Sequence, residues 1–186
     1  MKNTMLCAVV AVFAGMSQTA TRQTKWDAAA AEIVRIPPDA FAEVPPRVRS
    51  FLTGFGCAIP QAWGTDRPHN VVSGSFAQRG QTDWAALCSS DGSSAVHIVW
   101  GGDASCPTPI APPVADKAFL QDTGIDGILY SRGISRVRPD PRYWTAPQPF
   151  TLASSDHDAI SDAFYEKGAT AYYCQDGLWL EFQRGS

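Results

Sequence analysis

Residues 83–100 read DWAALCSSDGSSAVHIVW, and Asp91-Gly92 separates two largely apolar runs in this stretch. Asp-Gly between two such runs is a strong signal for a two-residue β-hairpin turn. If Ser90 opposes Ser93, one face carries Ala85, Leu87, Val96 and Ile98, and the other carries Trp84, Ala86, Cys88, His97 and Val99. Both faces are substantially apolar. We therefore expect strands over 83–88 and 95–100 in a sheet that is covered on both sides.

Further strands are expected on either side of this hairpin. Val71–Phe76 precedes it and Gly127–Val137 follows it, and both contain the Val, Ile or aromatic residues that strands favour. The chain closes with a second hairpin, Ala169–Gln175 and Leu178–Gln183, around an Asp176-Gly177 turn. In this hairpin Cys174 opposes Trp179 and Tyr173 opposes Leu180. The pattern predicts an antiparallel sheet built from hairpins.

Three segments have the composition of short helices. Trp26–Ile36 contains four consecutive alanines and ends before Pro37-Pro38. Pro45-Pro46 opens a second helix with Val48, Phe51 and Leu52 on one face, and Asp156–Lys167 is expected to form a short acidic helix. Fourteen prolines and fifteen glycines indicate many turns. The expected fold class is α+β, with short N-terminal helices packed on an antiparallel β-sheet and many loops.

Composition and charge fit one folded domain. The chain has 186 residues, of which 45% are hydrophobic and 11% aromatic, enough to fill a core. Its net charge of -3 and pI near 5.5 give no electrostatic basis for a nucleic acid or an anionic membrane as the main partner. No internal repeat divides the chain, so a single domain is expected.

The N-terminus has the pattern of a secretory signal. Lys2 precedes an apolar run from Met5 to Met16, which is too short to span a bilayer of ~30 Å as a helix. Small residues allow cleavage after Ser17 or Ala20, and a retained N-terminal anchor is the alternative. We expect residues 1–20 to be a signal peptide and residues 21–186 to be one exported domain, periplasmic or extracellular, with no transmembrane segment after cleavage.

Cleavage would leave four cysteines, Cys57, Cys88, Cys106 and Cys174. An even number in an exported chain predicts two disulfides, and three pairings are open. A zinc site needs closely spaced ligand pairs, whereas the sequence contains no Cys-x-x-Cys. The spacing therefore favours disulfides, and no metal or cofactor is expected.

One stretch resembles a known repeat. Gly74-Ser75-Phe76-Ala77-Gln78-Arg79-Gly80-Gln81-Thr82-Asp83 is similar to the loop frame of FG-GAP or VCBS repeats, so residues 71–100 resemble one such β unit. Family members bind calcium with side chains at the positions of Ser75, Ala77 and Arg79, and of that ligand set only Asp83 is present here. The resemblance implies a structural loop formed by Gly74, Phe76, Gly80 and Asp83, without the metal. We expect Gly80 to supply an unusual backbone angle and Asp83 to accept hydrogen bonds from loop amides.

A wider resemblance covers the order of three segments. Residues 56–61, 80–88 and 173–179 are similar to segments of a family of uncharacterised exported bacterial proteins. This resemblance implies a single exported domain and supplies no catalytic residues.

The strongest candidates for catalysis lie in Asp156-His157-Asp158, after Ser154-Ser155. A histidine beside a carboxylate has the groups needed for general acid–base chemistry, so a hydrolase using His157 with Asp156 or Asp158 is one hypothesis. The alternative is a helix start, capped by Ser155 or Asp156. In that helix the carboxylates at 158, 162 and 166 would share a face, either exposed or paired with the arginines at 132, 136, 138 and 142. Those arginines could instead receive an acidic ligand.

The remaining hypotheses concern binding. Six tryptophans and five tyrosines allow carbohydrate stacking, although aromatic residues in strands mostly fill cores. The proline-rich Pro107–Val114 loop beside Cys106 could enter the cleft of another protein, as a protease inhibitor does, or could simply cross a sheet. We expect His97 to be buried or half-buried. The sequence favours an exported, non-catalytic binding or structural module whose partner is a protein or a carbohydrate.

Overall fold

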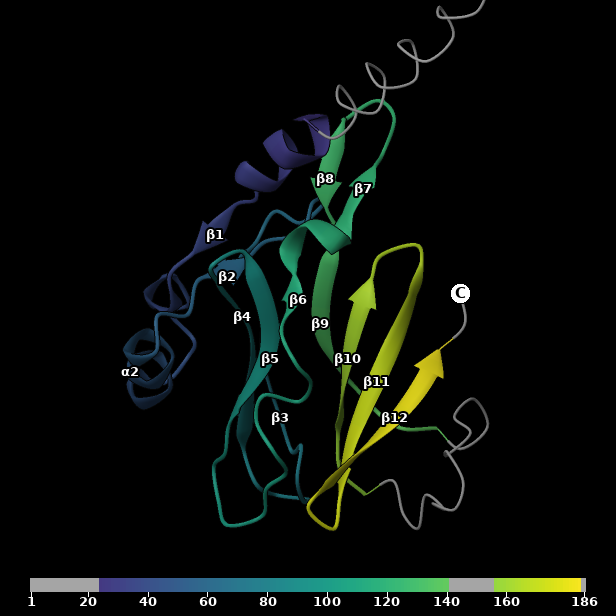
Figure 1. Cartoon of the computed structure of the whole chain (residues 1–186). Coiled ribbons are helices and arrows are strands. Elements are labelled where there is room, and N and C mark those ends of the chain that lie inside the picture. The colour runs from purple at the N-terminus through teal and green to yellow at the C-terminus, as the bar shows by residue number, and fades with distance from the viewer. Residues whose placement is uncertain (1–23, 141–155, 185–186) are drawn as a thin grey trace, which may run out of the picture.

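The computed structural model describes residues 24–140 and 156–184. The expected signal peptide, and the serines that precede the Asp156-His157-Asp158 cluster, lie outside the described residues. Two four-stranded antiparallel sheets dominate the fold, and they stand next to each other in Figure 1.

The first sheet contains the hairpin predicted at residues 83–100. It has the order β3 (Val71–Gly74), β4 (Asp83–Ser90), β5 (Ser93–Val99) and β6 (Val114–Ala115). The predicted register is confirmed, with Ser90 opposite Ser93 and Leu87 opposite Val96. Asp91 and Gly92 have φ values of 50° and 74°, as a tight hairpin turn requires.

The second sheet contains the C-terminal hairpin. Its order is β12 (Leu178–Arg184), β11 (Gly168–Gln175), β10 (Ala159–Phe164) and β9 (Arg132–Val137). Cys174 lies opposite Trp179, and Tyr173 lies opposite Leu180, so the predicted register is again confirmed.

The acidic helix predicted at Asp156–Lys167 is wrong, because β10 occupies residues 159–164. This strand lies between β9 and β11, and both neighbours provide hydrogen-bond partners for its backbone. Ile160 is fully buried in the core between the two sheets. Pairing on both sides and burial of this side chain outweigh a weak local helix propensity.

Two small sheets and the helices complete the fold. β1 (Arg35–Ile36) pairs with β2 (Ile59–Pro60), and β7 (Leu120–Asp122) pairs with β8 (Ile128–Tyr130). Residues 24–31 are helical, so the helix predicted to reach Ile36 ends earlier. The chain extends after it because Arg35 and Ile36 pair with β2 and Ile33 enters the core. Single 3-10 turns form at η1 (Pro38–Ala40) and η2 (Asp116–Phe119).

Apolar side chains fill the space between the sheets and cover the outer face of the first one. Between the sheets, Leu87 and Ile98 of the first pack in one cluster with Ile134 and Ile160 of the second. On the outer face, Ala86 and Cys88 pack in another cluster, with residues of α2 (Pro46–Gly54). The hairpin of residues 83–100 is therefore covered on both sides, as predicted (Figure 1).

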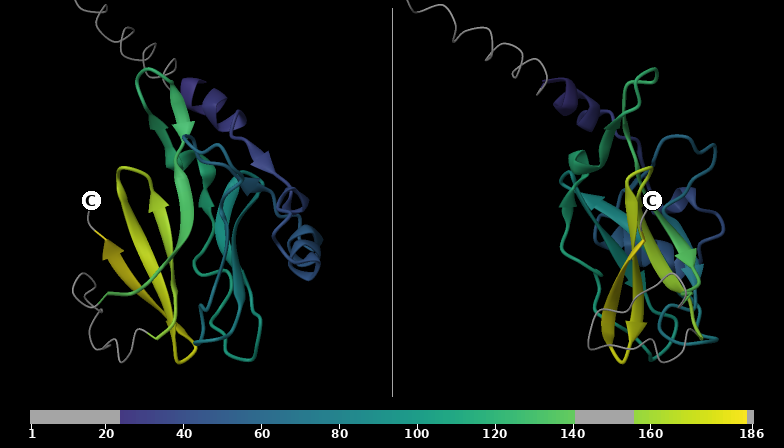
Figure 2. Two further views of the ribbon diagram at one scale, coloured as in Figure 1. Left: turned by 180° about the vertical axis from the view of Figure 1, so that it is seen from behind. Right: turned by 90° about the vertical axis from the view of Figure 1, so that its right-hand side faces the viewer.

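The fold is a mostly β sandwich with few helices, so the α+β prediction holds only loosely. Val48 and Leu52 of α2 are buried as predicted, but Phe51 is 48% exposed. Figure 2 shows the β7–β8 hairpin extending beyond one end of the two large sheets. In the described part of the chain, no helix has the length and apolar character needed to cross a membrane.

Asn70 joins the two large sheets along one edge. Its φ of 72° places it in the left-handed region, and its side chain is fully buried. The amide Nδ2 donates to the carbonyl oxygens of Pro60 and Arg132, and Oδ1 accepts from the Ile134 amide. One asparagine therefore fixes the start of β3 against β9.

The structure resolves the disulfide pairing as Cys57–Cys88 and Cys106–Cys174. The first bond ties the segment after α2 to β4, and the second ties the connector after β5 to β11. The prediction of two disulfides is confirmed, and such bonds indicate an oxidising environment.

Candidate functional site

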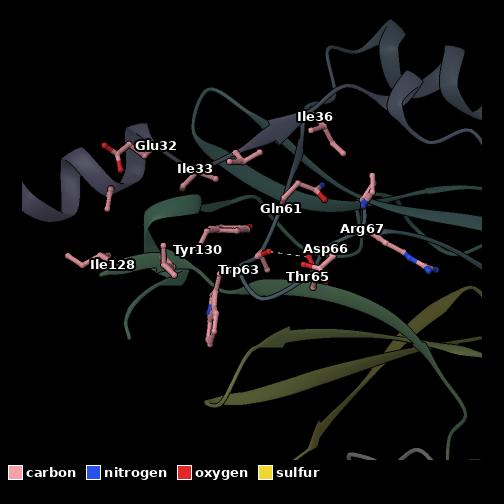
Figure 3. Close-up of a pocket in the computed structure, with 15 residues that line it drawn as sticks. Glu32, Ile33, Ile36, Gln61, Trp63, Thr65, Asp66, Arg67, Ile128 and Tyr130 are labelled. Atoms are coloured by element: carbon pink, nitrogen blue, oxygen red, sulfur yellow. Dashed lines mark hydrogen bonds between the residues drawn. The ribbon is translucent and has the colours of Figure 1, made fainter. Parts of the chain in front are cut away.

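A pocket of about 440 Å³ lies between the N-terminal segment, the loop after β2 and strand β8. Figure 3 shows Ile33, Trp63, Ile128 and Tyr130, which come from all three of these segments. The full lining consists of Ala29, Glu32, Ile33, Val34, Ile36, Gln61, Ala62, Trp63, Thr65, Asp66, Arg67, Pro68, Ile128, Leu129 and Tyr130.

The inner wall of the pocket is apolar and packed. Ile33, Ala62 and Tyr130 belong to one buried cluster, which also contains Leu120. Val34 has 61% of its surface exposed and also lines the pocket. An apolar concavity of this size with a few polar groups at its edge is the usual form of a ligand site.

Gln61 is the first residue of the loop after β2, and its side chain fixes the conformation of that loop. Its Nε2 donates to the carbonyl oxygens of Ile59 and His69, and its Oε1 accepts from the His69 amide. The backbone amide of Trp63 donates to the Tyr130 carbonyl, and the indole Nε1 donates to the Ser131 hydroxyl. These bonds attach one pocket wall to strand β8.

His69 holds the same loop through its imidazole ring. Its Nε2 accepts a hydrogen bond of 2.7 Å from the Ala62 amide, so this nitrogen carries no proton. The proton of the neutral ring is then on Nδ1, which lies 2.8 Å from the Thr65 hydroxyl and 3.2 Å from the Arg67 carbonyl. Burial lowers the pKa of His69, and the Arg67 carbonyl offsets part of that effect.

Acidification is expected to loosen this loop. The pKa of His69 in the folded protein lies below its ordinary value of 6.5, so the unfolded chain binds protons more readily. The contribution of His69 to stability is therefore complete above pH 6.5 and is lost as the pH falls from there through the folded-state pKa. Between about pH 7 and about pH 5, the melting temperature should therefore fall less in the His69→Gln variant than in the wild type.

His97 provides the comparison for this experiment, because burial also lowers its pKa, and the centre of its ring lies 4.8 Å from that of the tilted Phe55 ring. His97→Gln should separately reduce the pH dependence of the thermal stability. The double variant should show both reductions together. Full wild-type pH dependence in His69→Gln would contradict the role assigned to its Nε2.

Charged side chains at the edge of the pocket are available to a ligand. Glu32, Asp66 and Arg67 are exposed and line the pocket. In the described part of the chain, no hydrogen bond or ion pair engages their charged groups. Figure 3 shows Arg67 extending away from the apolar wall formed by Ile33 and Tyr130. The pocket therefore combines an apolar interior with ionic groups of both signs at its edge.

The candidate catalytic residues lie elsewhere, at the start of β10. His157 is buried and stacks in parallel on Tyr173 at 4.0 Å, and its Nδ1 lies 3.0 Å from the Asp158 carbonyl. Asp158 Oδ2 accepts from the Ser75 amide, while Oδ1 pairs with Arg138. Asp156 Oδ1 accepts from the Tyr173 hydroxyl. The two carboxylates are thus bonded to groups other than the imidazole.

The carboxylates expected to share one helix face have separate partners in the structure. Arg132 pairs with Asp162 at 2.7 Å, and Gln121 donates to Glu166. Arg138 pairs with Asp158, whereas Arg142 lies outside the described residues. In the ranges 24–140 and 156–184, no cluster of His, Cys, Asp or Glu could hold a metal ion.

Asp83 organises the loop of residues 74–83. Its Oδ2 accepts from the amides of Phe76 and Ala77, and its Oδ1 accepts from Gly101 and from the Gln81 side chain. Gly80 has a φ of 85°. Because these four donors occupy the buried carboxylate, the loop closes on Asp83 itself.

The Pro107–Val114 connector lies along β5. The Ile110 amide donates to the Val96 carbonyl, and the Thr108 hydroxyl accepts from the Ile98 amide. At the other end of the connector, the Trp179 indole donates to the Pro107 carbonyl beside the Cys106–Cys174 bond. These contacts hold the connector against the edge of the first sheet.

Sequence reasoning did not find the pocket. Gln61 and His69 are eight residues apart in an irregular loop, and their side chains meet only because that loop folds back. The spacing of Pro60, Gly64 and Pro68 predicts an irregular turn in this segment. It does not indicate that the turn forms the wall of a pocket. No family model, curated protein or solved structure matches the chain.

Proposed function

We propose that the protein is an exported binding module, periplasmic or extracellular, that captures an apolar group of its ligand in the pocket beside β8. The observation that carries this proposal is the combination of an apolar wall with the available ionic groups of Glu32, Asp66 and Arg67. The ligand is an amphipathic molecule whose apolar part contacts Ile33 and Tyr130 and whose polar end reaches the charged edge.

Rigidity supports this proposal. Gln61 and His69 fix the loop through hydrogen bonds to its backbone, and Trp63 fixes it to β8. A wall that is already ordered loses little conformational entropy when a ligand binds. The two disulfides add to this order and fit the proposed export, because such bonds persist outside the cytosol.

A fluorescent amphipathic probe tests the proposal. We expect anilinonaphthalene sulfonate to bind the native protein with increased fluorescence, because its rings are apolar and its sulfonate is anionic. Val34→Asp places a carboxylate beside the pocket on an exposed side chain, so it should weaken binding about tenfold, or ~1.4 kcal/mol, without unfolding the protein.

Ile125→Asp is the matched control, since Ile125 is 99% exposed and does not line the pocket. It changes the net charge by the same amount and should alter the affinity less than twofold. Absence of binding to the native protein, or equal weakening by both variants, would exclude this pocket as the site.

A further inference from the structure

A second cavity, of about 510 Å³, opens between the two large sheets. It is bordered by the end of the connector and β6 on one side and by the β10–β11 hairpin on the other, with η2 and β9 between them. Here we call it the inter-sheet cleft. Its lining consists of Ala111, Pro112, Val114, Phe119, Arg132, Asp162, Phe164, Lys167, Gly168, Ala169, Thr170 and Tyr172.

A buried ion pair lies in this cleft. Arg132 donates from Nε and Nη2 to the two carboxylate oxygens of Asp162, at 2.9 and 2.7 Å. Its Nη1 donates to the carbonyl and the hydroxyl of Ser94, and the guanidinium lies 4.3 Å from the centre of the Phe119 ring. The side chains of Arg132 and Asp162 are only 5% and 13% exposed. The charges of the pair cancel, so the cleft requires no net charge on a ligand.

Polar groups continue inward from this pair. Ser94 lies opposite Ser89 in the β4–β5 hairpin, and the Ser89 hydroxyl donates to Asp116, which also pairs with Arg35. Asp116 is fully buried, and its Oδ1 has no hydrogen-bond partner among the described residues. Asp116 is not among the residues that line the cleft, so this network supports the ion pair from outside the cleft and does not itself contact a ligand there.

Aromatic side chains form the walls of the cleft. Phe119 and Phe164 contact each other edge to face, with ring centres 5.6 Å apart. Tyr172 is half-buried, and burial, followed by nearby Asp162 and Glu181, raises its pKa to about 12. Its hydroxyl therefore stays protonated at neutral pH, and within the described residues it forms no hydrogen bond. The walls thus offer aromatic surface together with one available donor.

We propose that the inter-sheet cleft binds a neutral carbohydrate. A sugar ring presents C–H faces that pack on aromatic rings, and its hydroxyls both donate and accept hydrogen bonds. Asp162 accepts from sugar hydroxyls at its exposed edge, and Tyr172 donates to a sugar oxygen. Lys167 is exposed at the rim, where solvent screens its charge, so it adds little to the affinity.

Nuclear magnetic resonance titration tests this assignment. The isotope-labelled, oxidised protein is titrated separately with cellohexaose, mannohexaose and hexa-N-acetylchitohexaose at millimolar concentration. We expect at least one of these neutral oligosaccharides to shift the amide signals of residues 162–172. Tyr172→Phe keeps the ring and removes one hydroxyl, so it should weaken that binding about threefold to tenfold.

A control variant defines the outcome. Tyr165→Phe removes a hydroxyl from a tyrosine that does not line the cleft, so it should change affinity less than twofold. The proposal is overturned if none of the three oligosaccharides shifts the cleft signals, or if Tyr172→Phe and Tyr165→Phe have equal effects. Shifts confined to the signals of Ile33, Trp63 and Tyr130 would overturn it as well, because they would place the sugar in the other pocket.

Discussion

Replacing both Cys106 and Cys174 by alanine is expected to lower the free energy of unfolding by about 4 kcal/mol. This bond closes a segment with a sequence separation of 68, and a longer closed loop restricts the unfolded chain more. It also links the connector beside the first sheet to β11 of the second sheet. Urea denaturation followed by circular dichroism would measure the loss in the oxidised variant.

The Cys57→Ala/Cys88→Ala variant is the matched comparison. Its bond has a sequence separation of 31, and the logarithmic dependence on loop length gives a loss about 0.7 kcal/mol smaller. The Trp179 indole gives a local readout for the longer bridge, because it bonds to Pro107 beside Cys106 and its strand position is opposite Cys174. A loss below about 1 kcal/mol in the Cys106→Ala/Cys174→Ala variant would show that chain restriction is not the main role of that bridge.

Arg132→Met is expected to destabilise the protein by about 3–5 kcal/mol. The substitution keeps a long apolar side chain against Phe119 but leaves the Asp162 carboxylate buried without its bidentate partner. It also removes two hydrogen bonds to Ser94. The loss should appear in urea denaturation at neutral pH.

The Arg132→Met/Asp162→Leu double variant distinguishes two causes of the lost stability, an unpaired buried charge and a packing defect. Removing both charges should restore most of the stability, because an apolar pair of similar volume avoids the desolvation of two ions. The same double variant should lose oligosaccharide binding in the inter-sheet cleft while remaining folded. If it is no more stable than Arg132→Met, the cost comes from lost packing and not from the buried charge.

Tyr130 lies between the two cavities. Its ring lines the pocket beside β8, while Ser94, Asp116, Arg132 and Asp162 of the inter-sheet network all act on the pKa of its hydroxyl. Burial is the largest of these influences, and it raises that pKa. Among the described residues, the Tyr130 hydroxyl has no hydrogen-bond partner. The nearby Ser94 side chain nevertheless lowers the pKa of this hydroxyl in part. The proposed sites are therefore structurally adjacent.

The amino-acid sequence by itself determined the two long hairpins and the number of disulfides. Asp91-Gly92 and Asp176-Gly177 supply positive φ at both turn positions, which fixes the register of the flanking strands locally. Four cysteines in a chain with an expected export signal were enough to predict two bonds. Sequence could not choose among three pairings, because the pairing depends on which strands become neighbours in the folded protein.

Only the tertiary structure decided the strand at 159–164 and the two cavities. Local composition favoured a helix there, but β9 and β11 pair with the segment on both sides, and neither partner is encoded within it. The pocket needs Ile33, Gln61 and Tyr130 from three separate segments, and the cleft needs Arg132 beside Asp162, thirty positions later. Turn geometry is a property of adjacent residues, whereas a cavity is a property of how distant segments pack, so the sequence specified the first and left the second to the fold.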